Sequence, residues 1–266
     1  MNFLHFYQPQ PIFWDLGFIQ IRWYGLIMSV AILVGLWLAV RLAKKIKISA
    51  DEIYDLAMWS VVGGIVGARA YEVFIINWSY YAHNLSTIVK VWQGGLAIHG
   101  AIIGGALAVW LWSKKHQADF WQLVDLIAVV LPLGQTIGRW GNYFNQELFG
   151  RPTDWAIGLP ISKVNRPVGW ENYTYFQPTF LYESILNLFL FLGLILIYKK
   201  FKTPAGTIAI LYLLGYSVIR FFMEFVRLDL TPTFGWWRLP QLVSLIIFVL
   251  VIAFLVRKKV INFFFG

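Results

Sequence analysis

The sequence has 266 residues, of which 59% are hydrophobic and 13% are charged, and its formal net charge is +9. Soluble domains have roughly 45–50% hydrophobic and about 25% charged residues, and a soluble fold of this length could not bury so much apolar surface. Water-soluble, disordered and coiled-coil classes are therefore excluded, and a polytopic helical membrane protein remains.

Seven segments are apolar over the roughly 20 residues that a helix needs to cross a bilayer. They cover residues 20–41, 53–76, 94–113, 120–138, 178–198, 205–226 and 239–256. The sequence thus predicts an all-α polytopic membrane protein of about seven transmembrane helices, with residues 1–266 forming one membrane-embedded domain. The second, fourth and sixth helices carry ionisable groups, which are functional suspects inside a membrane, whereas the other four are clean. The first apolar run is too long for a cleavable signal peptide.

Basic residues form compact clusters at alternate connections. Twelve of the 22 lie at one set of helix ends: Arg41, Lys44, Lys45, Lys47, Lys114, Lys115, Lys199, Lys200, Lys202, Arg257, Lys258 and Lys259. Because cytoplasmic loops are enriched in Lys and Arg, we expect the N-terminus outside and the C-terminus in the cytoplasm. The longest connection, residues 139–177, then forms a small extracytoplasmic cap between helices four and five.

Ionisable side chains occur beside glycines in the second and third helices. Arg69 and Glu72 share one face of the second helix, and we interpret them mainly as packing groups, with a functional role as the alternative. His99 lies about five residues inside the outer end of the third helix. Such a His is often a satisfied interhelical hydrogen-bonding group, but it is also suited to proton transfer near neutral pH.

The fourth helix ends in the densest polar motif of the chain, residues 138–150. Its Arg139 offers a guanidinium fork that can bind phosphate oxygens in a bidentate manner. Asn142, Asn145 and Glu147 add hydrogen-bonding groups within nine residues, and three glycines allow sharp backbone paths. A simple interfacial turn would not need this combination.

The sixth helix carries Tyr216, Arg220, Glu224 and Arg227 at positions i, i+4, i+8 and i+11, which places them on one helical face. Pairing of Arg with Glu along the helix is one interpretation. The extra cation and the phenol one turn away favour the other, a binding site for an anion.

Polar side chains from five different helices fall in the outer part of the membrane under this topology: Tyr24, Arg69, His99, Arg139 and Arg220. Their common depth predicts a polar chamber near the outer leaflet, rich in Arg and poor in acids. Such a chamber suits a phospholipid head group.

The motif at 138–150, Gly-Arg-Trp-Gly-Asn-Tyr-Phe-Asn-Gln-Glu-Leu-Phe-Gly, resembles the signature of the prolipoprotein diacylglyceryl transferases, Gly-Arg-x-Gly/Ala-Asn-Phe-hydrophobic-Asn-x-Glu-x-x-Gly. Within it only Tyr143 departs, where the family usually has Phe. Ala101 also departs, because a second Gly commonly follows the His-Gly pair. Further segments agree in order and spacing: residues 22–25, 95–100, 177–183 and 216–227.

This resemblance implies an enzyme of bacterial lipoprotein biosynthesis in the cytoplasmic (inner) membrane, with its active site towards the extracytoplasmic side. The family transfers the sn-1,2-diacylglyceryl group of phosphatidylglycerol to the lipobox cysteine of preprolipoproteins, which releases glycerol 1-phosphate. It implies His99, Arg139 and Arg220 as catalytic residues. It further implies residues that bind phosphatidylglycerol: Arg139, Tyr24, Asn142, Glu147, Gly150, Tyr216, Glu224 and Arg227.

The chemistry of the residues fits this activity. The chain has no Cys, and the reacting thiol arrives on the substrate, where it must become a thiolate to attack. Arg139 and Arg220 would stabilise the charge that develops on the phosphate. Two accounts of thiol activation remain open: His99 acts as the base, or the arginines lower the thiol pKa and His99 only orients a substrate.

No metal-ligand set is visible in the sequence, and we expect no cofactor and no nucleic-acid partner. The four His do not cluster like zinc ligands, and Glu147 and Glu224 lie next to arginines that they would orient. A transporter would place its polar groups near the midplane and show internal repeats. A scaffold protein would not need Arg139 and Arg220 near hydrocarbon. Another phospholipid-using transferase is the nearest alternative.

Overall fold

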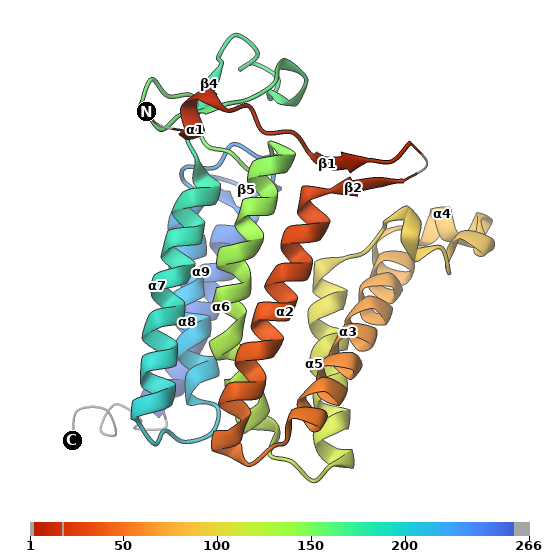
Figure 1. The fold of residues 1–266 in the computed structure, drawn as a ribbon, viewed down its shortest axis with the longest axis vertical. Coiled ribbons are helices and arrows are strands. Elements are labelled where there is room, and N and C mark those ends of the chain that lie inside the picture. The colour runs from red at the N-terminus through yellow and green to blue at the C-terminus, as the bar shows by residue number, and fades with distance from the viewer. Residues whose placement is uncertain (1–2, 18, 258–266) are drawn as a thin grey trace. The chain divides into compact units, whose positions relative to one another are not determined.

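The computed structural model in Figure 1 describes residues 3–17 and 19–257 and is mostly helical. Its α-helices are α1 Phe3–Phe6, α2 Trp23–Ala43, α3 Ala50–Tyr71, α4 Trp78–His83, α5 Ile98–Lys115, α6 Phe120–Asn145, α7 Thr179–Lys200, α8 Thr207–Met223 and α9 Leu239–Arg257. The strands among the described residues form antiparallel pairs: β1 Ile12–Asp15 with β2 Gln20–Arg22, β3 Leu159–Pro160 with β4 Tyr175–Phe176, and β5 Thr233–Phe234 with β6 Trp237–Arg238. One π-helical turn, Glu72–Ile76, continues α3.

Five helices in the described ranges are long and apolar enough to cross a membrane: Trp23–Ile46, Ala50–Ile76, Phe120–Asn145, Thr179–Lys200 and Leu239–Val256. The other two predicted segments are occupied by α5 and by α8, an apolar helix that is shorter than these five. A mostly helical polytopic membrane protein is therefore confirmed. The count of seven spans and the orientation of the chain stay predictions, and the basic Lys258 and Lys259 lie outside the described residues.

Several helix boundaries differ from the predicted ones. Residues 20–22 form strand β2, so the first long helix begins at Trp23. The helix predicted from residue 94 begins at Ile98, because Gly94 and Gly95 adopt φ angles of +89° and +70° that only Gly adopts readily. His99 is consequently the second residue of α5 and does not lie a full turn inside it.

The fourth and sixth predicted helices also end at other residues than the sequence predicts. The fourth predicted helix continues to Asn145, because Gly138 and Gly141 are helical and serve close packing, so the cap proper begins after residue 145. The sixth predicted helix ends at Met223. Arg227 therefore lies beyond α8, and its expected place on the same helical face as Tyr216 and Arg220 is wrong.

The chain divides into two compact units. One contains the residues up to 35 together with those from 128 onward, and the other contains residues 36–127. That residues 1–266 form one membrane-embedded domain stays a prediction.

In the first unit, α7 packs on α8 and α8 packs on α9, as Figure 1 shows. The Ser184 hydroxyl of α7 donates to the Thr136 carbonyl of α6 at 2.8 Å, and Trp23 of α2 stacks on Phe144 of α6. The cap is held onto these helices by an apolar core of Tyr143, Phe149, Leu159, Ile161, Phe176 and Phe180. The end of the unit that carries the 138–150 motif is therefore tied to both α6 and α7.

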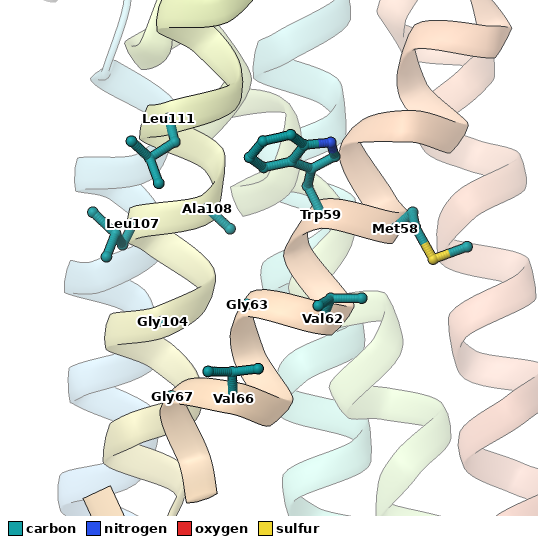
Figure 2. Close-up of a pocket in the computed structure, with 10 residues that line it drawn as sticks. All are labelled: Met58, Trp59, Val62, Gly63, Val66, Gly67, Gly104, Leu107, Ala108 and Leu111. Carbon is teal, nitrogen blue, oxygen red and sulfur yellow. The ribbon is translucent and has the colours of Figure 1, made fainter. Parts of the chain in front are cut away.

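The second unit is built on a close contact between α3 and α5. A Cβ atom added at Gly63 would lie 2.8 Å from the Gly104 carbonyl oxygen, and one at Gly67 would lie 2.8 Å from the Gly104 Cα. Figure 2 shows these glycines facing each other along the two helices, beside the apolar side chains of a shallow groove. Glycines at a four-residue spacing let membrane helices approach closely, so this pair is joined mainly by backbone contact.

Candidate active site

Three arginines meet at the carboxylate of Glu183 in the first turns of α7. Arg139 from α6 pairs with Glu183 Oε2, the Arg227 Nη1 atom lies 3.0 Å from Oε1, and the Arg220 Nη1 atom from α8 lies 3.8 Å from Oε1. The Glu183 side chain is only 5% exposed. A carboxylate so buried would be costly without partners, and the arginines compensate its charge. Glu183 thereby joins α6, α7 and the end of α8.

A second buried carboxylate, Glu224, lies directly after α8. Its Oε2 atom is 3.1 Å from Arg220 Nη2, one helical turn earlier, and its Oε1 atom is 3.1 Å from Arg238 Nε. The expected pairing of Arg220 with Glu224 is thus present. Arg220 is held between two carboxylates, Glu183 and Glu224, which fix the direction of its side chain.

Within the segment between α8 and α9, further ion pairs and hydrogen bonds bind Arg227 and Glu224. Arg227 Nε donates to Asp229 Oδ1 at 2.7 Å, and Arg238 donates to the carbonyls of Glu224, Arg227 and Asp229. Burial alone would raise the pKa of Asp229, but the hydrogen bond and the charge of Arg227 outweigh it and hold this pKa below its usual value. The same pairing overcomes the burial of Arg227 and raises its pKa.

The arginines differ in how much of each remains available. Arg227 is 4% exposed and is committed to Glu183 and Asp229, whereas Arg139 and Arg220 are 18% and 19% exposed. Arg220 Nη1 makes no hydrogen bond within the described residues. The ion pairs in this part of the chain join four arginines to three carboxylates, Glu183, Glu224 and Asp229. Arg139 and Arg220 are therefore placed to bind an anion.

A short relay of amides links Arg139 to the exposed end of the motif. Arg139 Nη1 donates to Asn142 Oδ1 at 3.2 Å, and Asn142 Nδ2 donates to Glu147 Oε1 at 2.8 Å. Asn145 Nδ2 also reaches Glu147 Oε1, at 3.3 Å. Glu147 therefore acts on Arg139 through Asn142 and not by direct pairing.

Two glycines of the motif bring other segments close to it. A Cβ atom at Gly141 would lie 2.7 Å from the ring of Tyr24, so this glycine lets the Tyr24 ring pack on α6. A Cβ atom at Gly150 would lie 2.9 Å from Thr179 and 3.0 Å from the Val226 carbonyl. Gly150 also forms a bridge with Arg227. The start of α7 and the segment after α8 meet at this glycine.

Tyr216 lies one turn before Arg220 on α8 and stacks on Tyr212, with ring centroids 5.7 Å apart. The first unit thus contains all the sequence-predicted site residues except His99. Arg139 and Arg220 meet at Glu183, and Tyr24 of α2 packs on α6 at Gly141, two residues after Arg139. Arg69 and His99 belong to the other unit, and the common chamber of all five side chains stays a prediction.

His99 lies at the start of α5 and is exposed. Its ring faces Tyr71 of α3, with centroids 5.9 Å apart, and it makes no side-chain hydrogen bond within the described ranges. Arg69 is buried in the same unit and donates to backbone carbonyls, while Glu72 accepts a hydrogen bond from Asn77 at 2.6 Å. The His99 imidazole is therefore held by ring contact with Tyr71 and not by a side-chain hydrogen bond within the described residues.

Sequence reasoning left Glu183, Asp229 and Arg238 out of the candidate site. It described the fifth predicted helix as clean, and that description is wrong, because this helix contributes the carboxylate that pairs with the most arginines. The signal was present, since a Glu within an apolar 20-residue segment is itself expensive. Residues 3–17 and 19–257 contain no group of three or more His, Cys, Asp or Glu that could hold a metal ion.

Comparison with known proteins identifies the family. Residues 11–257 match the family model described as prolipoprotein diacylglyceryl transferase. The protein named phosphatidylglycerol–prolipoprotein diacylglyceryl transferase in Acaryochloris marina is 46% identical over 242 residues, which cover 91% of this chain and 88% of the relative. Proteins of the same name are 44% identical in Thermosynechococcus vestitus, over 87% of this chain and 86% of the relative, and 39% identical in Symbiobacterium thermophilum, over 94% and 92%. The chain belongs to the prolipoprotein diacylglyceryl transferase family.

Proposed function

We propose, from membership of this family, that the protein transfers the sn-1,2-diacylglyceryl group of phosphatidylglycerol to the lipobox cysteine of preprolipoproteins. The products are a thioether-linked prolipoprotein and glycerol 1-phosphate, and the reaction is the first step of bacterial lipoprotein maturation. The observation that carries the proposal is the pair of partly exposed arginines Arg139 and Arg220, which are held together at Glu183. We place the reaction at the extracytoplasmic side of the cytoplasmic membrane.

The arginines account for the bond that breaks. The substrate thiolate attacks the glyceryl carbon that bears the phosphate, a carbon–sulfur bond forms, and the carbon–oxygen electrons pass to the departing phosphate. New negative charge develops on that phosphate, and donors aimed at it from a preorganised site stabilise the transition state. Arg139 and Arg220, whose side chains stay partly exposed, are the residues best placed for this role.

The remaining residues of the first unit bind the lipid head group or orient the arginines. Tyr24, Asn142, Glu147 and Tyr216 offer hydroxyl, amide and carboxylate groups to a polar head group around Arg139. The remaining predicted residues of this unit act by holding the arginines and the chain in place: Glu224, Arg227 and Gly150.

For the thiol we propose His99 as the base. A thiol has a pKa of about 8.5 and is mostly protonated at neutral pH, so a neutral imidazole can accept its proton as it attacks. The alternative is that the arginines lower the thiol pKa by themselves. Activity of His99→Gln decides between these accounts, because near-normal turnover at pH 7 contradicts a base role.

The function is tested with purified protein, phosphatidylglycerol and a lipobox peptide. We expect release of glycerol phosphate together with a gain of diacylglyceryl mass on the peptide cysteine. Arg139→Ala should abolish both signals, whereas the matched control Arg151→Ala, at an exposed arginine of the cap, should retain them. Absence of product from folded wild-type protein overturns the proposal, and product from another phospholipid alone indicates a different transferase.

We further propose that the reaction needs no metal. The carboxylates of the cluster are engaged by arginines, so the positive charge at the phosphate comes from guanidinium groups. We expect full activity in the presence of a chelator, and a strict requirement for an added divalent cation contradicts this.

A further inference from the structure

Arg69, near the end of α3, donates hydrogen bonds to backbone carbonyls of the segment that leads into α5. Its Nε atom donates to the Ile88 carbonyl at 2.8 Å, and its Nη2 atom donates to the Thr87 carbonyl. Its Nη1 atom donates to the carbonyls of Gly94 and Gly95, at 2.7 and 2.9 Å. One guanidinium thus fixes two stretches of backbone, at residues 87–88 and 94–95.

The surroundings of Arg69 exclude simpler roles. Its side chain is buried, and four of its five N–H donors bind backbone carbonyls, so its main role is to hold the backbone. Glu72 is hydrogen-bonded to Asn77, and the group that faces the Arg69 guanidinium is the Tyr81 ring, 5.0 Å away. A buried guanidinium pays a desolvation cost that these carbonyls compensate, which makes their positions strongly dependent on Arg69.

The glycine pair carries this constraint into α5. Gly95 has a φ angle of +70°, and a Cβ atom there would lie 2.7 Å from Arg69 Nη1 and 2.9 Å from the Tyr81 hydroxyl. Two residues later the Ala97 amide donates to the Ala68 carbonyl at 3.2 Å. The first turn of α5 is therefore anchored to the same turn of α3 that carries Arg69.

His99 lies in that first turn. The next residue, Gly100, packs directly against the Gly67 carbonyl and the Tyr71 side chain, and the His99 ring faces the Tyr71 ring. The imidazole makes no side-chain hydrogen bond within the described residues, so the backbone of this turn and the Tyr71 ring set where it lies.

From these contacts we infer that Arg69 is a positioning residue for His99, acting through the Gly94–Gly95 turn and the first turn of α5. The inference deepens the proposed function and rests on His99 as the base. Arg69 would not touch either substrate. It would hold the imidazole where the incoming thiol can reach it.

The first test uses Arg69→Lys. A lysine ammonium is a single point charge and cannot span carbonyls as widely separated as those of residues 87 and 95. We expect kcat at pH 7 to fall by about ten- to hundredfold, as misplacement of a reacting group does, with KM for phosphatidylglycerol unchanged.

The pH profile separates a positioning role from a merely structural one. Above the thiol pKa of about 8.5 the substrate ionises without a base, so the defect of Arg69→Lys should shrink, as should that of His99→Gln. Loss by the same factor at every pH, or no loss at pH 7, overturns the inference.

The two glycines provide a matched pair of variants. Gly94→Ala and Gly95→Ala share the strain of a positive φ angle, but only the Cβ atom at residue 95 meets Arg69, since nothing lies within 4 Å of one at residue 94. We expect Gly95→Ala to reproduce the pH-dependent defect of Arg69→Lys and Gly94→Ala to show a smaller one. Equal defects contradict the inference.

Amide hydrogen exchange measured without substrate tests the positioning role of Arg69 independently of the reaction. The amides of residues 97–101 should exchange faster in Arg69→Lys than in wild-type protein, and unchanged exchange overturns the inference even if the enzyme is active. If wild-type protein forms no product, the proposed function fails, and the exchange result still reports whether Arg69 holds the start of α5.

Discussion

At the scale of single residues, the arginines of the first unit separate into two kinds. Arg227 is almost fully buried and paired at both ends of its guanidinium, while the side chains of Arg139 and Arg220 stay partly exposed. Glu183 contacts all three and sets their spacing. An anion that binds here meets two arginines already held in place, so little reorganisation accompanies binding.

Glu183→Gln tests this dependence. A glutamine keeps the shape of the side chain but leaves the arginines without their shared countercharge. We expect kcat to fall by about a hundredfold, because the phosphate-binding groups lose their fixed positions. We also expect the protein to lose about 3–5 kcal/mol of stability, as happens when one partner of a buried ion pair is removed.

Activity assays and thermal unfolding in detergent measure both effects. Glu171→Gln, at an exposed carboxylate of the cap, is the matched control and should change neither quantity. Wild-type kcat in Glu183→Gln would contradict the organising role of Glu183.

Much of the candidate site was predictable at this scale, and one central residue, Glu183, was missed. Arg139, Asn142 and Glu147 were found because they crowd into nine residues, and the structure joins them in one relay. Glu183 stands alone in an apolar helix, so local density gave no signal. Its partners come from α6 and from beyond α8, and only the packing of these segments reveals them.

At the scale of elements, glycine determines how α3 and α5 pack. A Cβ atom at Gly100 would overlap the Gly67 carbonyl and the Tyr71 side chain. At Gly105, five residues further along α5, the nearest atom to such a Cβ is the Ser60 carbonyl oxygen at 3.9 Å. The two glycines look alike in the sequence but face different surroundings.

We therefore expect Gly100→Ala to force the helices apart and destabilise the protein by about 1–3 kcal/mol. Gly105→Ala should be neutral or stabilising by up to about 1 kcal/mol, because Ala favours the helix. Thermal unfolding of the two variants in the same detergent compares them directly. Equal stability of Gly100→Ala and Gly105→Ala would contradict the close packing of α3 on α5.

The segment between α8 and α9 has its own pH dependence. Because pairing with Arg227 holds the pKa of Asp229 below its unfolded value near 3.8, Asp229 binds protons more weakly in the folded state. Its contribution to stability is therefore present above pH 4 and is lost as the pH falls through the lowered folded pKa.

Asp229→Asn should lower the melting temperature at pH 7, and the difference from wild type should shrink as the pH falls below about 4. Melting curves from pH 7 down to pH 3 measure this. A constant difference across that range would show that the carboxylate charge is not the cause.

Element positions were predicted better than element ends. Helices occupy all seven predicted segments, since apolar runs of this length leave few alternatives. The start of α5 and the end of α8 were misplaced because they depend on contacts. Arg69 binds the backbone of residues 94–95, which turn just before α5. Residues 224–227 leave the helix because this segment pairs with the backbone at Phe149 and Gly150.

At the scale of the whole molecule, the charge pattern makes a prediction about orientation. Lys202 lies in the exposed connection between α7 and α8, within one of the basic clusters that the positive-inside rule assigns to the cytoplasm. Val168 lies in the cap and is 94% exposed. The two positions are thus expected on opposite sides of the membrane.

The absence of Cys makes this testable without background. In intact cells with a permeabilised outer layer, a membrane-impermeant maleimide should label Val168→Cys and leave Lys202→Cys unlabelled. Lysis should make both react, which controls for local accessibility. The reverse pattern would place the cap in the cytoplasm, away from exported preprolipoproteins, and so would contradict the proposed side of the reaction as well as the orientation.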